Sequence, residues 1–196
     1  MNYTKQKIFN LALKNLKVST PVSAANKSDK NYAVLDEFYE TAVLQVLEAT
    51  DWTFANCYKQ LNLLVNERPL NPCYQFAYDY PNDVACPRLI VVGKGEEQEF
   101  FEIASVNKKL QLWTNRENAV LKYTRNDIDE KEFSSNFAMA LSWYLAFLAC
   151  PSVSGARATQ ADCMQIYKEQ IQQAKITNAN ADYPVDESAC NWIDVR

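Results

Sequence analysis

Asp51-Trp52-Thr53-Phe54-Ala55 is the stretch that decides how this chain folds, and a second aromatic stretch, Phe76-Ala77-Tyr78-Asp79-Tyr80-Pro81-Asn82-Asp83, follows it. In both, large aromatic side chains stand beside residues that favour turns or helix ends, so we place them where one element gives way to the next. No arrangement of residues in the chain supports catalysis. The two stretches therefore predict a protein whose function depends on shape.

Upstream of Asp51, apolar residues recur three or four positions apart and predict two amphipathic helices. The first begins after Thr4, a good N-cap, and ends near Lys17. The second runs from about Asp29 to Glu48 and has the most regular apolar stripe in the chain.

Downstream of the first aromatic stretch, residues 57–85 contain three prolines, which exclude a long helix and favour extended segments and turns. Short runs rich in β-branched, aromatic and other apolar residues then predict an antiparallel meander, with strands at 89–92, 100–103, 110–113 and 120–123. Gly93-Lys94-Gly95 is interpreted as a hairpin turn, because no glycine pattern for phosphate binding is present.

A helical pattern returns at Asp129, an N-cap with Glu132 three residues later, and runs to Cys150 before a proline. Its segment Phe137–Cys150 is apolar on nearly every side, and its 14 residues are too few to cross a bilayer. We expect a core helix, or one covered by a neighbouring subunit. A last helix is predicted at roughly 155–176.

These elements predict a mainly α (α+β) fold. Residues 1–176 form one domain with a four-helix core and a small inserted antiparallel β-meander at about 86–125. Residues 177–196 lack any period and are predicted to form an extended C-terminal tail. Hydrophobic residues make up 48% of the chain and charged residues 22%, values typical of a globular protein.

The net charge of -4 argues against a protein that grips nucleic acid through its phosphates. Charge is nevertheless unevenly distributed. Residues 1–31 hold six lysines and one acid, whereas residues 32–56 hold five acids and no base. Two readings stay open: attraction between helix faces within one subunit, or a contact between neighbouring copies in a ring.

The chain contains no histidine, which excludes Ser-His-Asp and Cys-His catalysis and removes the commonest metal ligand. The cysteines form no CxxC pair, so we predict free thiols in a reducing compartment at Cys57, Cys73, Cys86, Cys150, Cys163 and Cys190. The N-terminus has no apolar signal core. We expect no metal, no cofactor and no enzymatic activity.

Two carboxylate clusters leave a glycosidase as an alternative, since such enzymes need two carboxylates across a cleft. The clusters are Glu96, Glu97, Glu99 and Glu102, and Asp127, Asp129, Glu130 and Glu132. The simpler interpretation is that they solubilise a hairpin and stabilise a helix N-terminus. For the aromatic run 76–80, packing is favoured over base stacking, because no basic residue lies nearby.

Taken in order, these features resemble the head-to-tail adaptor family of short-tailed bacteriophages, also called tail tubular protein A. The matching residues are Trp52, Phe54 and Ala55, then Tyr78, Pro81 and Asp83, then Leu121, Lys122, Tyr123, Thr124, Asp127, Phe133, Phe137, Ala140, Leu141 and Leu145, and finally Tyr167 and Ala174. Each motif alone is degenerate, and the ordered set is specific. Two positions depart from the family: Lys17-Val18 replaces a glycine, and Phe76 or Tyr74 replaces a tryptophan.

The resemblance implies a virion protein of the tail and neck region, assembled in the host cytoplasm. It implies a dodecameric ring below the portal protein that lengthens the DNA channel and supports the tail nozzle and fibre proteins, with DNA passing through unbound and no membrane contact. A cytoplasmic scaffold is a third alternative.

The last residues contain Tyr183, Trp192 and Ile193, which we interpret as anchors on the portal or on a neighbouring subunit. The alternative is that Trp192 folds back on its own subunit.

Overall fold

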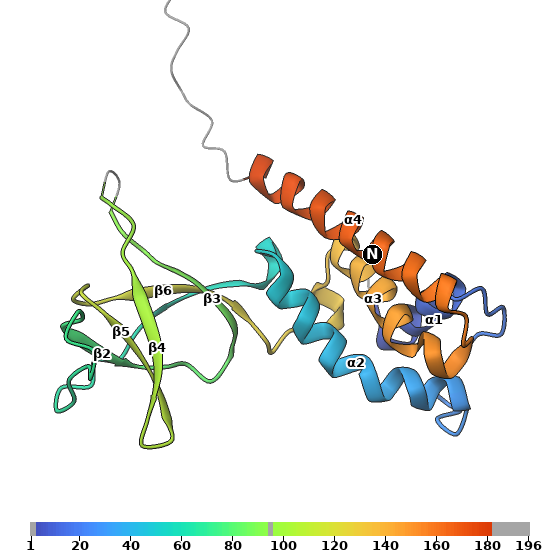
Figure 1. The fold of residues 1–196 in the computed structure, drawn as a ribbon, viewed down its shortest axis with the longest axis horizontal. Coiled ribbons are helices and arrows are strands. Elements are labelled where there is room, and N and C mark those ends of the chain that lie inside the picture. The colour runs from blue at the N-terminus through green and yellow to red at the C-terminus, as the bar shows by residue number, and fades with distance from the viewer. Residues whose placement is uncertain (1–2, 94–95, 182–196) are drawn as a thin grey trace, which may run out of the picture.

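A computed structural model describes residues 3–93 and 96–181, and it arranges them in two parts (Figure 1). Residues 3–55 and 126–181, here called the helical lobe, contain the α-helices. Residues 56–125, the β lobe, contain the strands. The fold is mixed α+β, in agreement with the class predicted from the sequence. Because the helical lobe is interrupted by the β lobe, the chain crosses between them twice.

The first two helices begin at side-chain caps. Helix α1, Lys5–Asn15, has Thr4 as its N-cap, as predicted, and α2 spans Lys30–Ala49. The Asp29 carboxylate accepts the N–H groups of Asn31 and Tyr32. These bonds satisfy donors that have no partner within the helix, so both starts are specified locally.

Helix α3, Ser135–Val153, begins six residues later than the sequence pattern indicated. The predicted capping box between Asp129 and Glu132 is present, but it closes a short 3-10 turn, η2, at Glu130–Glu132. The Ser134 hydroxyl accepts the Phe137 N–H and is the true N-cap of α3. The prediction mistook one capped turn for the start of the next helix.

We expected Pro151 to end α3, but it lies within the last turn of the helix. A proline has no N–H to donate, so the carbonyl of Phe147 loses its helical partner. The amide Nε2 of Gln160 donates to that carbonyl at 3.3 Å and replaces the missing bond. Gly155, with a φ of 65°, then turns the chain out of the helix.

Helix α4 spans Arg157–Ala181 and packs along α3. Residues 177–181 are therefore helical, and the prediction of an extended tail from residue 177 is wrong for them. The predicted anchors Tyr183, Trp192 and Ile193 lie outside the described residues. Figure 1 shows α4 and α2 on opposite sides of α3.

The strands begin at Asn56, thirty residues before the predicted insertion at about 86. They are β1 Asn56–Gln60, β2 Phe76–Asp79, β3 Val84–Ile90, β4 Phe101–Val106, β5 Lys109–Thr114 and β6 Val120–Arg125. Strands β3 to β6 contain the four predicted runs in whole or in part. Strands β1 and β2 fall largely within residues 57–85, where the sequence predicted extended segments and turns without assigning a strand.

The strands form two antiparallel sheets, ordered β1-β6-β3 and β2-β5-β4, so the predicted meander is wrong. Only β4 and β5, joined by Asn107-Lys108 with positive φ at both positions, form a tight hairpin. The other pairings join strands distant in sequence. In the first sheet Cys57 and Pro87 both pair with Tyr123, which makes β6 its central strand.

Two hydrophobic clusters occupy the two lobes. The larger draws buried residues from all four α-helices and includes Trp52, Ala55 and Phe137. The smaller lies between the sheets and includes Tyr78, Leu112 and Tyr123. Helix α3 is 19 residues long and apolar enough by composition to cross a membrane, but half of it is buried against the other helices. The five cysteines among the described residues carry free thiols.

Candidate functional site: the joint between the lobes

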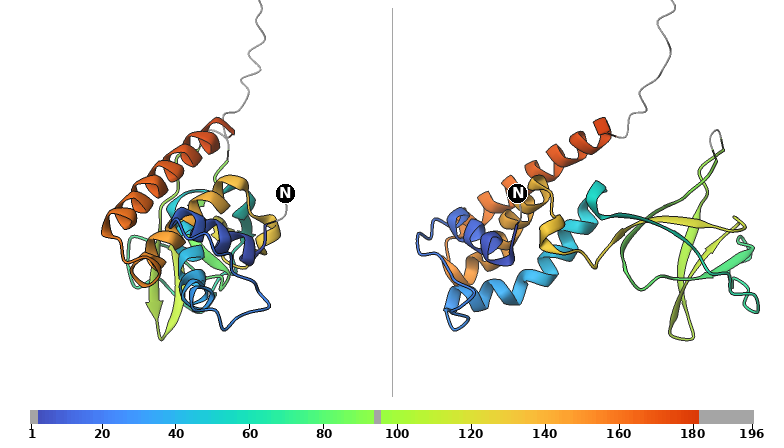
Figure 2. Two further views of the ribbon diagram at one scale, coloured as in Figure 1. Left: turned by 90° about the vertical axis from the view of Figure 1, so that its right-hand side faces the viewer. Right: turned by 180° about the vertical axis from the view of Figure 1, so that it is seen from behind.

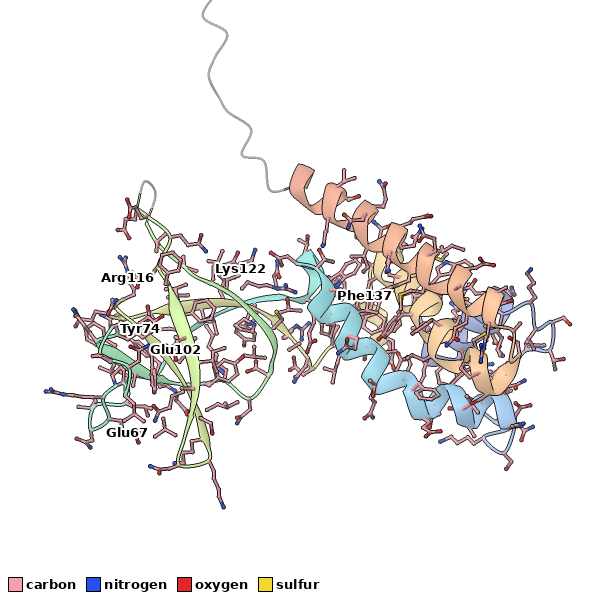
Figure 3. The ribbon with its side chains drawn as sticks, viewed as in Figure 1. Glu67, Tyr74, Glu102, Arg116, Lys122 and Phe137 are labelled. Atoms are coloured by element: carbon pink, nitrogen blue, oxygen red, sulfur yellow. The ribbon has the colours of Figure 1, made fainter. Side chains whose placement is uncertain are left out.

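Trp52 contacts both the end of α2 and the start of α3. Its indole Nε1 donates to the carbonyl of Val46 at 2.7 Å, and its ring meets that of Phe137 edge-on, with centroids 5.1 Å apart. Phe54 packs on Phe137 and Phe133 from the next turn, the 3-10 helix η1 at Thr53–Ala55. Trp52 is only 2% exposed, and Figure 3 shows Phe137 inside the helical lobe behind α2. The first motif is thus a packing device.

The C-terminal end of α2 is capped from the β lobe. Helix α2 has no basic residue in its last turn, and Glu48 lies there, where the helix dipole disfavours an acid. Arg88 of β3 supplies the missing charge. Its guanidinium donates to the carbonyls of Leu47 at 3.0 Å and Thr50 at 2.6 Å, and its Nε donates to Thr124 on β6 at 2.9 Å.

A second link across the joint is an ion pair. The Lys122 Nζ of β6 lies 2.7 Å from an Asp51 carboxylate oxygen, with the Lys122 side chain only 12% exposed. Figure 3 shows Lys122 on the side of the β lobe that faces the end of α2. Arg88 and Lys122 therefore contact residues 47–51, where α2 ends and the chain leads into η1.

Asp83 of the second motif ties together the strands of the first sheet. Its carboxylate accepts the Tyr123 hydroxyl of β6 at 2.6 Å and lies 3.5 Å from the Lys59 ammonium of β1. The Tyr123 hydrogen bond, with Lys59 as a weaker contributor, lowers the pKa of Asp83. Burial, followed by the bond to Asp83, raises the pKa of Tyr123.

Tyr78 and Pro81, also in the second motif, are buried in the β lobe. The Tyr78 hydroxyl donates to the carbonyl of Arg116 at 2.7 Å and so fixes the turn before β6. The two motifs thus belong to different hydrophobic clusters. Asp83, the last residue of the second motif, bonds to Tyr123 of β6. The aromatic run 76–80 packs within the β lobe, as the sequence indicated.

Most of the acidic residues that suggested a glycosidase have a structural partner within the subunit. Glu96 accepts the Gly93 N–H and pairs with Arg116 at 2.7 Å. Glu99, Glu102 and Glu130 accept bonds from Thr114, Asn71 and Tyr39 respectively. Hydrogen bonds from backbone N–H groups lower the pKa of Glu96 and of Asp129. A general acid needs the opposite shift in its pKa.

Candidate metal ligands are dispersed over residues 3–93 and 96–181. Within these ranges no three His, Cys, Asp or Glu side chains come together as a metal site. One cavity of about 310 Å³ lies against α2 and is lined by Tyr39, Glu40, Val43, Leu44, Asn126, Ile128, Glu130 and Phe133. Its polar lining includes the Glu40 carboxylate and the Glu130 carboxylate, which accepts the Tyr39 hydroxyl at 3.3 Å.

Exposed apolar side chains are concentrated in the β lobe. They are Tyr58, Leu63, Val65, Leu70, Phe100, Ile103 and Leu110, of which Val65 is 83% exposed. So many uncovered large side chains on one small lobe are typical of a surface that contacts other proteins.

No known family model matches this chain, and no curated protein matches it. The assignment of a function therefore depends on the residues and contacts described above.

The aromatic residues of the joint, Trp52 and Phe54, were identified from the sequence, but its basic residues were not. Arg88 and Lys122 were not singled out as functional residues, because their partners are thirty or more positions away in sequence. One signal was available: α2 ends with an acid and with neither glycine nor base, so its carbonyls need a donor from elsewhere.

Proposed function

We propose that the chain is a structural subunit of a virus particle, the head-to-tail adaptor of a short-tailed bacteriophage. In this proposal copies of the chain form a ring between portal and tail nozzle, and the ring continues the DNA channel. The observation that carries it is the joint between the lobes. The motif residues that suggested the family pack the helical lobe or join strands of the β lobe. Arg88 and Lys122 make the contacts that hold the two lobes together.

The division into lobes supports such a role. The finer proposal is that the four-helix core forms the body of the ring and the β lobe projects from it. The exposed apolar residues of the β lobe, such as Val65 and Leu70, then meet tail nozzle or fibre proteins. A net charge of -4 suits a conduit, since phosphates that bound its wall would slow DNA passage.

Residues 182–196 complete the proposal as an anchor. The portal or an adjacent copy is bound by Tyr183, Trp192 and Ile193. Burial of each of these side chains contributes about 1.5 to 3 kcal/mol to the free energy of binding, before the entropic cost of ordering the segment. Deleting residues 182–196, beyond the end of α4, should leave the thermal midpoint nearly unchanged and abolish binding to portal rings. If the truncated protein binds portals with unaltered affinity, the anchoring role is wrong. A matched control replaces these three residues with serine and keeps the chain length.

Electron microscopy of the purified protein mixed with the portal encoded beside it tests the proposal directly. The expected image is a ring, with dodecameric symmetry, on one end of the portal. A protein that stays off the portal at micromolar concentration would refute the adaptor role. A zymogram on bacterial cell walls checks the glycosidase alternative, and neighbouring genes for portal and capsid proteins separate the adaptor from a cytoplasmic scaffold.

A further inference from the structure

Opposite charges on α1 and α2 are only partly neutralised within the subunit. Lys5 of α1 pairs with Asp36 of α2 at 2.7 Å, and Asp51 pairs with Lys122. The first pair realises the intramolecular attraction that the sequence suggested. It accounts for one lysine and one acid of the two charged segments, and the remaining exposed charges include one group on α2 and another at the end of α1.

The first face belongs to α2 and is called the acidic face. Glu37, Glu40, Leu44 and Glu48 are exposed and three or four positions apart, so they share one side of the helix. Within the described residues these three glutamates form no ion pair. Neighbouring like charges on a helix repel each other, and the repulsion is relieved when cations cover them.

An apolar hollow lies beside the acidic face. The cavity of about 310 Å³ contains Val43, Leu44, Ile128 and Phe133, with Glu40 and Glu130 among its lining residues. Leu44 is 40% exposed at its edge. Figure 2 shows α2 at the side of the helical lobe remote from α4, so neither α4 nor the β sheets cover this region.

The second face, called the basic face, lies at the end of α1. Lys14 and Lys17 are exposed and, like the glutamates, form no ion pair in the part of the chain described. Beside them Leu11 and Val18 are half-buried, so apolar surface accompanies the charge. Acidic residues around an apolar hollow on one element match basic residues around apolar side chains on another.

We infer that the basic face of one copy docks on the acidic face of a second copy. Lys14 and Lys17 then approach Glu37, Glu40 and Glu48, and an apolar side chain of the partner's basic face covers the hollow beside Leu44. The inference rests on the proposed function in one respect, that a ring requires contacts between copies. It specifies which faces make them.

Charge complementarity favours a second copy over nucleic acid. Phosphates are repelled by the acidic face, and the two lysines of the basic face release too few counterions for tight binding. A contact of this kind is weak between exposed charges and sensitive to salt, because the Debye length falls to about 3 Å at 1 M.

Charge reversal on full-length protein tests the contact. One variant carries Lys14→Glu and Lys17→Glu, which makes both faces acidic. The other carries Glu37→Lys and Glu40→Lys, which makes both faces basic. Matched controls reverse equal charge on exposed positions of α4, Lys168→Glu with Lys175→Glu, and Asp162→Lys with Glu169→Lys. Sedimentation velocity at low salt measures self-association.

Wild-type protein is expected to self-associate at low salt and to dissociate at high salt. Each charge-reversed variant alone should associate at least about tenfold more weakly, because its two faces repel. An equimolar mixture should recover association to within about threefold of wild type, since every contact then joins opposite charges. The α4 controls should behave as wild type.

A mixture that stays monomeric, while both variants keep wild-type circular dichroism and thermal midpoints, overturns the inference. So does wild-type protein that remains monomeric at about 100 μM in low salt, where such contacts are least screened. Portal binding is assayed separately. If the mixture recovers self-association but does not bind the portal, the contact between copies is supported and the adaptor role is refuted. If both variants bind the portal but their mixture does not recover self-association, the adaptor role is supported and the contact is refuted.

Discussion

Arg88 is the side chain on which the end of α2 depends. Replacing it with alanine leaves the carbonyls of Leu47 and Thr50 without their donor and removes the only cation from the negative end of the helix among the described contacts. Hydrogen bonds that involve a charged group contribute about 1.5 to 3 kcal/mol each, so Arg88→Ala should lower the free energy of unfolding by about 2 to 4 kcal/mol. Urea denaturation followed by circular dichroism measures the loss.

Two controls separate capping from general effects of lost charge. Arg88→Lys keeps the charge but cannot reach Thr124 and the helix end together, so we expect about half of the loss. The exposed Arg68→Ala should change stability by less than about 0.5 kcal/mol. An Arg88→Ala variant as stable as the Arg68 control would show that water caps α2 equally well.

Lys17 occupies a backbone conformation that suits glycine. Its φ is 62°, and the Val18 N–H donates back to the carbonyl of Leu13 at 2.9 Å, which is the bonding of a glycine-type helix end. The adaptor resemblance expects a glycine near this position, so the structure explains the departure as strain that Lys17 tolerates. Lys17→Gly should raise the thermal midpoint, by a gain of about 0.5 kcal/mol.

The opposite result is expected one turn earlier. Lys14 is inside α1, where glycine costs about 1 kcal/mol, so Lys14→Gly should lower the midpoint. Equal effects at both positions would mean that φ at residue 17 does not limit stability.

The sheet β1-β6-β3 gives the protein a defined acid sensitivity. The folded state lowers the pKa of Asp83, so this carboxylate stabilises the fold above its unfolded pKa of about 3.9. The contribution is lost as the pH falls through the lower folded value. Tyr123→Phe removes the main cause of the lowered pKa and should flatten the dependence of the free energy of unfolding on pH below about 4.

Tyr58→Phe on β1 is the matched control, because that side chain is exposed and should leave the pH dependence unchanged. Urea titrations at a series of pH values give the slopes. If the Tyr123→Phe slope equals that of wild type, another carboxylate controls the acid transition.

Helices were easier to predict from the sequence than strands, for a physical reason. The starts of α1 and α2 are encoded by Thr4 and Asp29, which bond to N–H groups within three residues of themselves. Strands β1 and β2 receive their partners from β6 and β5, dozens of residues later, and a window of sequence contains no trace of that pairing. The predicted meander was wrong because it paired strands that are neighbours in sequence, whereas most of the observed pairs join strands that are distant in sequence.

In the candidate site, too, residues with local partners could be predicted from the sequence, and residues with distant partners could not. Trp52 and Phe54 could be recognised because an aromatic pair directly after a helix implies a local turn and burial. Their basic counterparts could not, since Arg88 resembles any other charged strand residue until β3 lies against α2. Asp83 was picked out through its motif, whereas Tyr123, its partner, was noted only as a family match.

The molecule as a whole should unfold as one unit as long as the joint is intact. The lobes have separate hydrophobic clusters, so Arg88 and Lys122, which bond across the joint, carry the coupling between them. Hydrogen exchange followed by mass spectrometry along a urea gradient should show α3 and β6 losing protection together in wild type. In Arg88→Ala the two losses should occur at different urea concentrations. Coincident losses in the variant would place the coupling elsewhere.

The interruption of the helical lobe by the β lobe also has a consequence during synthesis. Helix α2 ends at Ala49, but α3, which covers the apolar sides of α1 and α2, starts only at Ser135. At about 5 to 20 residues per second a ribosome needs roughly 4 to 17 s to make that interval. Until α3 is made, Leu35 and Leu47 lack the packing partners that α3 gives them in the folded protein, and the central strand β6 is completed only at Arg125. We therefore expect polysomes making this protein to recruit chaperones that shield two short apolar helices until the last third of the message has been read.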